Sequence, residues 1–197
     1  TRAVARGLRH AFLVADMPFM SYTNPGQALD NAVRMMQEGG AMMIKLESGG
    51  GQLEIVEHLA DHDIPVCAHL GLKPQSVHKL GGFRVQGRDP DVAEEMLSAG
   101  KRLQDAGADI VLLECVPNEL GQAMTQQLDV PVIGIGAGPH VDGQILVLYD
   151  VLGITLGRTP RFVRNFQQGH DSPLAAVQAY VQAVKDGSYP APEHCFS

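Results

Sequence analysis

The chain has 197 residues, of which 45% are hydrophobic and 19% charged, and its formal net charge is −7. This length can bury one sizeable core, so we expect residues 1–197 to form a single domain. Lysine and arginine form no basic stripe along the sequence, which argues against a nucleic-acid partner. No apolar stretch approaches the roughly 20 residues of a membrane span, which argues against a membrane partner.

The cysteines indicate the compartment. Cys67, Cys115 and Cys195 are odd in number, far apart and without CxxC spacing. This pattern predicts neither a disulfide framework nor a zinc site, and it fits a reducing environment. We therefore expect a cytoplasmic protein.

Apolar runs and helical patterns alternate over the first two thirds of the chain. After a basic, helix-like stretch at residues 1–10, apolar runs predict strands at residues 11–17, 41–47, 64–70, 108–117 and 130–138. Amphipathic segments between them predict helices at residues 25–38, 52–61, 91–106 and 118–127. Asn24 and Pro25 form a suitable N-cap and first residue for the first of these helices.

The last third is less regular. Residues 143–153 carry apolar side chains at offsets typical of one helix face, so we predict a helix there. Residues 161–166 are predicted as another strand, followed by a terminal helix over residues 172–187. About six strands alternating with helices predict a parallel α/β architecture. A (β/α)₈ TIM barrel has eight strands, so either the sheet is open or the first two βα units are absent from this chain.

Polar side chains follow the predicted strands at the points where the strands end. These residues are Asp16, Lys45, Glu47, His69 and Glu114, together with the glycines of "GIGAG" at 134–138. Parallel strands bring their carboxyl ends to one face, where barrel and doubly wound enzymes place their sites. The sequence therefore predicts a site at this edge of the sheet.

Four of these residues also have a purely structural interpretation. Asp16 can cap the turn that follows it, and Lys45 can extend its apolar stem along the surface towards water. Glu47 lies on the same side of its strand as Lys45 and can be its ion-pair partner. A single histidine such as His69 is often a hydrogen-bonded core residue.

The residue types suggest metal-assisted chemistry on a keto acid. Asp16 and Glu47 would offer two carboxylates to Mg²⁺, which accepts a small number of protein ligands when water and a chelating substrate complete its octahedron. An α-keto acid chelates through its carboxylate and carbonyl oxygens, and the metal would acidify the neighbouring C–H group. Lys45 could then stabilise the enolate charge. Glu114, at an apolar strand end that should raise its pKa, is the candidate base.

Two glycine-containing segments need a separate interpretation. "GIGAG" resembles a dinucleotide-binding loop only superficially, because Pro139 occupies the place of the third glycine of GxGxxG. We expect a tight turn there that approaches a ligand or a neighbouring loop. Residues 71–89 are long for a connection and predict a lid or binding loop.

Cys115, without an activating partner, is interpreted as a packing residue.

Seven segments together resemble one known family in order and spacing. They are "LVADMPFMSY", "IKLESGG", "PVCAHLGLKPQSV", "GGFRVQGR", "VLLECVP", "PVIGIGAGPHVDGQILVLYD" and "LGITLG", and they extend over essentially the whole chain. They resemble the ketopantoate hydroxymethyltransferase family. The resemblance implies a (β/α)₈ barrel that transfers the one-carbon unit of the co-substrate 5,10-methylenetetrahydrofolate to 3-methyl-2-oxobutanoate. The product would be 2-dehydropantoate, a precursor of pantothenate and coenzyme A.

The same resemblance assigns roles to the strand-end residues. It implies that Asp16 is a Mg²⁺ ligand in contact with the substrate, and that Glu47 lies at the metal or its bound water. Lys45 and His69 would contact the keto acid, and Glu114 would accept its proton. The family forms ring-stacked decamers, so the resemblance also implies a homo-oligomer, a decamer.

The sequence departs from the family in one respect. Members carry a "VGDS" motif before the "ADMPF" strand, with an aspartate that binds the metal, and this chain starts after that point. We therefore expect an N-terminally incomplete barrel. Two other interpretations stay open: another Mg²⁺-dependent keto-acid barrel of the phosphoenolpyruvate mutase and isocitrate lyase type, or a non-catalytic barrel fragment.

Overall fold

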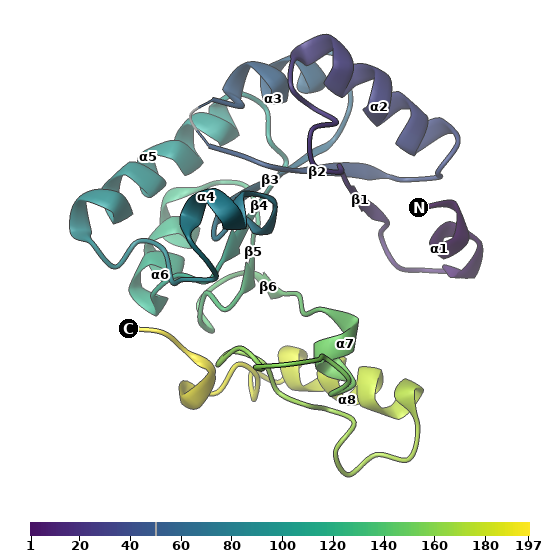
Figure 1. Ribbon diagram of the computed structural model, residues 1–197, viewed down its shortest axis with the longest axis vertical. Coiled ribbons are helices and arrows are strands. Elements are labelled where there is room, and N and C mark those ends of the chain that lie inside the picture. The colour runs from purple at the N-terminus through teal and green to yellow at the C-terminus, as the bar shows by residue number, and fades with distance from the viewer. Residues whose placement is uncertain (50) are drawn as a thin grey trace.

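The computed structural model describes residues 1–49 and 51–197 and contains one curled, fully parallel sheet (Figure 1). Its six strands follow one another in chain order, β1-β2-β3-β4-β5-β6. Their bounds are β1 Val14–Asp16, β2 Met43–Glu47, β3 Val66–Gly71, β4 Ile110–Glu114, β5 Val132–Ile135 and β6 Gly143–Gln144. The predicted parallel α/β architecture is confirmed.

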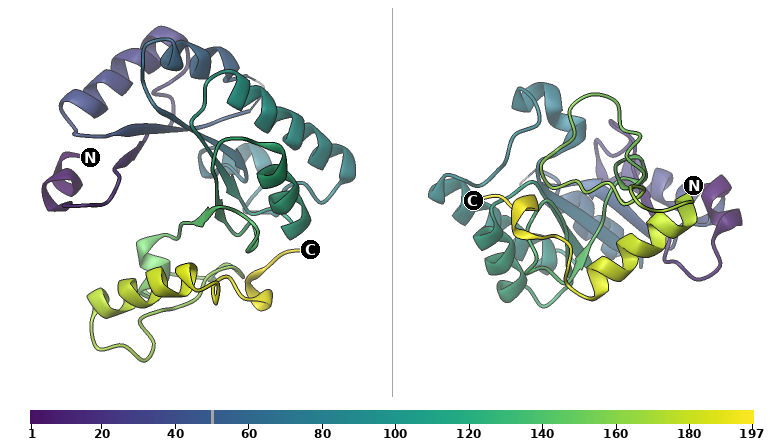
Figure 2. Two further views of the ribbon diagram at one scale, coloured as in Figure 1. Left: turned by 180° about the vertical axis from the view of Figure 1, so that it is seen from behind. Right: turned by 90° about the horizontal axis from the view of Figure 1, so that it is seen from below.

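Helices lie along the outer side of the curled sheet, as the two views of Figure 2 show. The outer layer consists of α2 Pro25–Gln37, α3 Leu53–Ala60, α5 Pro90–Asp105 and α6 Asn118–Gln127. The remaining helices are α1 Arg2–Gly7, α4 Val77–Leu80, α7 Leu148–Val151 and α8 Pro173–Lys185, with 3₁₀ turns η1 Pro74–Ser76 and η2 Pro192–His194. In the part of the chain that the structure describes, no helix is both long and apolar enough to cross a membrane.

The predicted start of α2 is confirmed in detail. The side chain of Asn24 accepts a hydrogen bond from the Gln27 amide at 3.0 Å, and Pro25 occupies the first helical turn, where no amide donor is needed. Asp89 before Pro90 and Ser172 before Pro173 repeat this arrangement at α5 and α8. These caps satisfy orphan amides and fix where the helices begin.

The sheet separates two apolar cores because successive residues of a strand face opposite sides. In β2, Ile44 and Leu46 are fully buried in the outer core against the helices. Met43 belongs to the inner core on the concave side, and Lys45 and Glu47 follow it at the same spacing. Each strand thus contributes alternate side chains to the helix layer and to the concave face.

The inner core becomes polar towards the carboxyl ends of the strands. Its apolar members include Met43, Cys67, Leu112 and Ile135, and Phe162 from the C-terminal region covers them. In their strands, Met43, Cys67 and Leu112 are each followed two residues later by a charged or titratable side chain on the same face. The apolar floor therefore lies directly below the polar edge.

Two element predictions in the last third were wrong. Residues 143–153 do not form one helix, because Gly143 and Gln144 pair with Ile133 and Gly134 of β5, and only Leu148–Val151 is helical. Edge pairing satisfies backbone groups that a helix would have satisfied internally. Residues 161–166 form a loop whose Phe162 and Phe166 are buried in different clusters, so their apolar character reflects anchoring rather than a strand.

The sheet is open at both edges. Among residues 1–49 and 51–197, β1 pairs only with β2 and β6 only with β5, so the described strands form a curled half-barrel.

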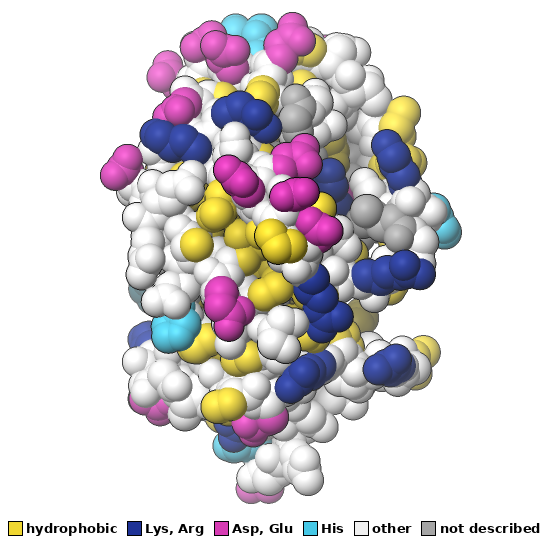
Figure 3. All heavy atoms as spheres, turned by 90° about the vertical axis from the view of Figure 1, so that its left-hand side faces the viewer, with side chains coloured by type: hydrophobic (Ala, Val, Ile, Leu, Met, Phe, Trp, Pro, Cys, Tyr) yellow, Lys and Arg dark blue, Asp and Glu magenta, His cyan; other side chains and the backbone are white. Residues whose placement is uncertain are grey.

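Figure 3 shows the face on the side of α5 and α6, where basic side chains lie scattered among acidic ones around apolar side chains.

Candidate active site

The concave face brings the predicted strand-end residues together at one edge. The register places Asp16 beside Lys45, Glu47 beside His69, and Glu114 between Gly71 and Ile135. The strands are parallel and neighbouring, so these side chains occupy one continuous rim above the apolar floor.

Lys45 forms its ion pair with Asp16. Its Nζ lies 2.7 Å from the Asp16 Oδ2 atom, with the lysine side chain 15% exposed and the aspartate side chain 53% exposed. Glu47, the partner suggested by the spacing within β2, does not form this contact. The pair therefore joins the rim of β1 to that of β2 and leaves Glu47 for another role.

Glu47 is a buried carboxylate that uses only one of its oxygen atoms. The residue is 5% exposed, and its Oε1 accepts a hydrogen bond from the Gln75 amide at 2.8 Å. Its Oε2 is buried and has no hydrogen-bond partner among the described residues. Burial raises the pKa of this carboxyl, while the Gln75 amide, His69 and Lys45 lower it.

Gln75 and Tyr22 are site residues that the sequence did not reveal. Gln75 lies on η1, within the predicted binding loop 71–89, and its Oε1 accepts a hydrogen bond from the Tyr22 hydroxyl at 2.6 Å. Its Nε2 donates to the carbonyl of Met17 at 2.8 Å. Burial and the nearby Glu47 charge raise the pKa of Tyr22 to about 12, so its hydroxyl stays a proton donor. In the sequence, the one feature that marks Gln75 is its position directly after a proline in this loop.

His69 and Glu114 form the second close pair of the rim. The Nε2 atom of His69 is 3.3 Å from the Oε2 atom of Glu114, and the two side chains are 1% and 14% exposed. The approach lacks the alignment of a hydrogen bond, so both ring nitrogens of His69 are without such a partner in the described chain. A buried imidazole in this state is available to a ligand, because an unmade hydrogen bond in the interior is costly.

The backbone around Glu114 is fixed by two turns. The Glu114 carbonyl accepts from the Leu72 amide at 2.8 Å, and Gly71 adopts a φ of 87° directly against it. A Cβ at Gly71 would collide with that carbonyl oxygen. Cys115 has a φ of 51°, and its amide donates to the Ile135 carbonyl at 2.9 Å. Burial raises the pKa of the Cys115 thiol to about 12, consistent with the predicted packing role.

The "GIGAG" segment forms the expected tight turn. Gly136 and Gly138 have φ values of 64° and 82°, and a side chain at Gly138 would collide with Asn118 at the start of α6. The turn thus approaches the first residue of α6 as well as the loop that carries Phe162, which a side chain at Gly136 would meet, so both positions require glycine.

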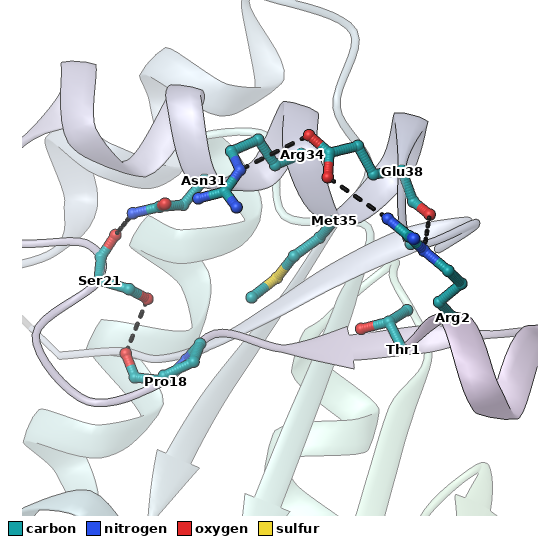
Figure 4. A pocket seen from close by; sticks show the side chains of 9 residues that line it. Thr1, Arg2, Pro18, Ser21, Asn31, Arg34, Met35 and Glu38 are labelled. Atoms are coloured by element: carbon teal, nitrogen blue, oxygen red, sulfur yellow. Dashed lines mark hydrogen bonds and ion pairs between the residues drawn. The ribbon is translucent and has the colours of Figure 1, made fainter.

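Two hollows lie near the rim of β1. A cavity of about 200 Å³ has Glu47, Tyr22, Lys73 and Gln75 in its wall, so it borders the candidate site. A larger one of about 330 Å³ lies between α1 and α2, where Arg2 and Arg34 both contact Glu38 (Figure 4). None of the predicted site residues lines the larger cavity, so we place the site at the strand ends.

The described residues contain no group of three or more His, Cys, Asp or Glu side chains arranged to hold a metal ion. Asp16 and Glu47 nevertheless suit a partly hydrated hard cation, because Mg²⁺ is held by one or two carboxylates with water and substrate oxygens. Glu47 Oε2, which has no hydrogen-bond partner among the described residues, is an oxygen atom of the kind that such a cation binds.

Comparison with known proteins assigns the chain to a family. A family model described as ketopantoate hydroxymethyltransferase matches residues 1–192. The chain belongs to the ketopantoate hydroxymethyltransferase family. The resemblance of the seven segments is thus confirmed, and the chain is assigned to a family of transferases rather than to the phosphoenolpyruvate mutase group.

Relatives in this ketopantoate hydroxymethyltransferase family share more than half of their aligned residues with the chain. A protein of Alkalilimnicola ehrlichii named 3-methyl-2-oxobutanoate hydroxymethyltransferase is 59% identical over 196 residues, covering 100% of this chain and 71% of the relative. A protein of the same name from Nitrosococcus oceani is 56% identical over 189 residues, covering 96% and 72%. N-acetylneuraminate lyase of Mycoplasma synoviae matches in structure with a TM-score of 0.47 and 9% identity, over 68% of this chain and 53% of the lyase. This last likeness adds nothing to the assignment.

Proposed function

We propose that the protein transfers a hydroxymethyl group from 5,10-methylenetetrahydrofolate to 3-methyl-2-oxobutanoate and produces 2-dehydropantoate. The names of the relatives support the reaction. The observation that carries it to this chain is the rim itself, where the Lys45 and Asp16 pair lies on the same edge as the His69 and Glu114 pair. A cation, an imidazole and a carboxylate base are the groups that enolising a keto acid requires.

Asp16 and Glu47 are the residues that we propose hold Mg²⁺. Glu47 supports this proposal with a buried oxygen atom that lacks a hydrogen-bond partner in the described structure, and Asp16 supports it with a half-exposed carboxylate. When bound, the ion would polarise the substrate carbonyl and increase the acidity of the neighbouring C–H bond.

Three side chains would act on the substrate directly. Lys45 would attract the keto acid and stabilise the negative charge that develops on its oxygen. His69 would hydrogen-bond the substrate through the ring nitrogens that lack partners in the described chain. Glu114 would accept the C3 proton on its carboxylate, after which C3 forms a bond to the one-carbon unit of the folate. For this bond to form, water would first release the one-carbon unit from the folate as formaldehyde, so that both C–N bonds break and tetrahydrofolate leaves. The aldehyde oxygen would then take the proton back from Glu114 and become the new hydroxyl group.

We further propose that the curled sheet is part of a complete (β/α)₈ barrel in a single domain. In the part of the chain that the structure describes, the outer edges of β1 and β6 are unpaired, and this supports the proposal because further parallel strands can pair with free edges. We also propose that the protein works as a homo-oligomer, a decamer, as the family resemblance implies.

Exchange of the C3 hydrogen of 3-methyl-2-oxobutanoate with solvent deuterium tests the role of Glu114 without the folate. Glu114→Gln removes the proton acceptor but keeps the size of the side chain, so we expect exchange, followed by proton NMR, to slow by about a hundredfold or more. Glu95→Gln, which alters an exposed glutamate of α5, is the control and should exchange at the wild-type rate.

The outcomes separate the competing interpretations. Wild-type exchange in Glu114→Gln would remove Glu114 from the chemistry. Absence of exchange in the unaltered protein, with Mg²⁺ present, would favour the non-catalytic barrel fragment.

A further inference from the structure

Gln75 contacts three separate parts of the rim. Its backbone amide donates to Glu47 Oε1 at 2.8 Å, at the end of β2. Its side-chain Nε2 donates to the Met17 carbonyl at 2.8 Å, and its Oε1 accepts from the Tyr22 hydroxyl at 2.6 Å. Every one of these partners lies beyond or at the end of β1 or β2, although Gln75 itself follows β3.

Met17 connects this contact to Asp16. Met17 is fully buried, directly follows Asp16, and donates its own amide to the Lys45 carbonyl at 2.9 Å. Its backbone is therefore held on both sides, by β2 through the amide and by Gln75 through the carbonyl. A shift of Gln75 would be transmitted to the Asp16 strand end and to the Glu47 carboxylate together.

We propose that Gln75 is a positioning residue that holds the Glu47 carboxylate and the Asp16 strand end in a fixed relation to each other. Its amide occupies Oε1 of Glu47, which leaves the buried Oε2 as the oxygen that faces a ligand. Its side chain anchors that amide by using both the donor and the acceptor of the carboxamide. Tyr22 is the outer anchor of the same arrangement.

The functional consequence rests on the proposed Mg²⁺ role of Asp16 and Glu47. Side chains that orient metal ligands change metal affinity when they are removed, even though they never touch the ion. A residue that only maintained the fold would instead lower the amount of active protein equally at all Mg²⁺ concentrations.

The test uses Gln75→Met, which keeps the length of the side chain and removes both of its hydrogen bonds. We expect the half-saturating Mg²⁺ concentration for C3 hydrogen exchange to rise by about tenfold or more, while the rate at saturating Mg²⁺ is largely retained. Tyr22→Phe removes one anchor and should show a smaller rise. In the metal-free protein, the amide of position 75 should exchange with deuterium faster in Gln75→Met than in wild type, as measured by NMR.

Gln104→Met is the matched control. Gln104 on α5 also uses both ends of its carboxamide, accepting from the Asp129 amide at 2.7 Å and donating to the Asp129 carboxylate at 3.1 Å, but it lies in the outer layer. Its replacement should change neither the Mg²⁺ dependence nor the amide exchange at position 75.

The two measurements separate the positioning role of Gln75 from the proposed Mg²⁺ role of Asp16 and Glu47. A Gln75→Met protein with wild-type Mg²⁺ dependence and wild-type amide exchange at position 75 would overturn the proposal. If Mg²⁺ affects neither protein, the metal assignment of the proposed function is wrong, and the amide exchange alone decides whether Gln75 anchors the contact to Glu47.

Discussion

Carboxylates at the two ends of the strands each accept a backbone hydrogen bond but differ in burial, because Asp109 and Asp142 are exposed to water whereas Glu47 is buried. Asp109 and Asp142 accept hydrogen bonds at 2.8 Å from the amides of Val66 and Val132, at the amino ends of β3 and β5. At the carboxyl ends, by contrast, Glu47 keeps a buried oxygen without a hydrogen-bond partner in the described structure. An unmade hydrogen bond of this kind costs about 1–3 kcal/mol, so this difference supports placing the candidate site at the carboxyl ends of the strands.

The inner-core thiols permit a prediction at the scale of single residues. Burial raises the pKa of both Cys67 and Cys115 to about 12. At pH 8, only on the order of one thiol in ten thousand would then be the reactive thiolate. We expect iodoacetamide to leave positions 67 and 115 unmodified in the folded protein and to label both after unfolding, as measured by peptide mass spectrometry. Rapid labelling of the folded protein at either position would contradict the buried inner core.

The strand-end residues of the site were predictable, but their partners were not. Parallel strands bring their carboxyl ends to one edge of the sheet, so the predicted strands alone place Asp16, Lys45 and Glu114 at one rim. The choice of Asp16 over Glu47 as the ion-pair partner of Lys45 depends on the register between β1 and β2, which the sequence does not state. Gln75 was missed for a related reason, because the course of its loop is set by tertiary contacts.

At the scale of elements, helix starts were predicted more accurately than the edge of the sheet. A side-chain acceptor followed by proline marks the starts of α2, α5 and α8 through purely local chemistry. The strand β6 has only Gly143 and Gln144 and exists because β5 offers an edge to pair with. A helical pattern in the following residues obscured this short strand, since pairing partners are not visible in a local pattern.

The cap of α2 gives a test at this scale. Asn24→Ala removes the acceptor for the Gln27 amide, so we expect the free energy of unfolding to fall by about 1 kcal/mol in urea titrations. Asn24→Asp keeps an acceptor and adds a negative charge at the positive end of the helix, so its stability should stay near that of wild type. Equal losses in both variants would show that the side-chain acceptor is not what stabilises this start.

At the scale of the whole molecule, the sheet separates the main apolar core from the candidate site. The outer core packs β1 to β5 against α2, α3, α5 and α6, whereas the inner core forms the floor of the candidate site. The predicted number of about six strands agrees with the structure, although residues 161–166 are a loop and residues 143–144 supply the last strand. The layer order follows from periodicity, but the curl and the free edges depend on contacts between distant segments.

Removing a large side chain from the outer core should be costly. Leu103 on α5 is fully buried, so we expect Leu103→Ala to lower the free energy of unfolding by about 2–5 kcal/mol. Leu156 is 96% exposed, so Leu156→Ala should change the free energy of unfolding by less than about 0.5 kcal/mol. Urea unfolding followed by circular dichroism compares the two, and a similar effect of both would refute the assignment of the main core to the helix layer.

The alternation along β2 also limits how this protein can change by insertion or deletion. Deleting one residue from the middle of Met43–Glu47 would turn the side chains after it to the opposite face. A lysine or a glutamate would then enter the apolar helix layer, while a leucine would take its place among the side chains of the candidate site. We therefore expect insertions and deletions to be tolerated in the connections between strands, where they leave the facing of the strand side chains unchanged.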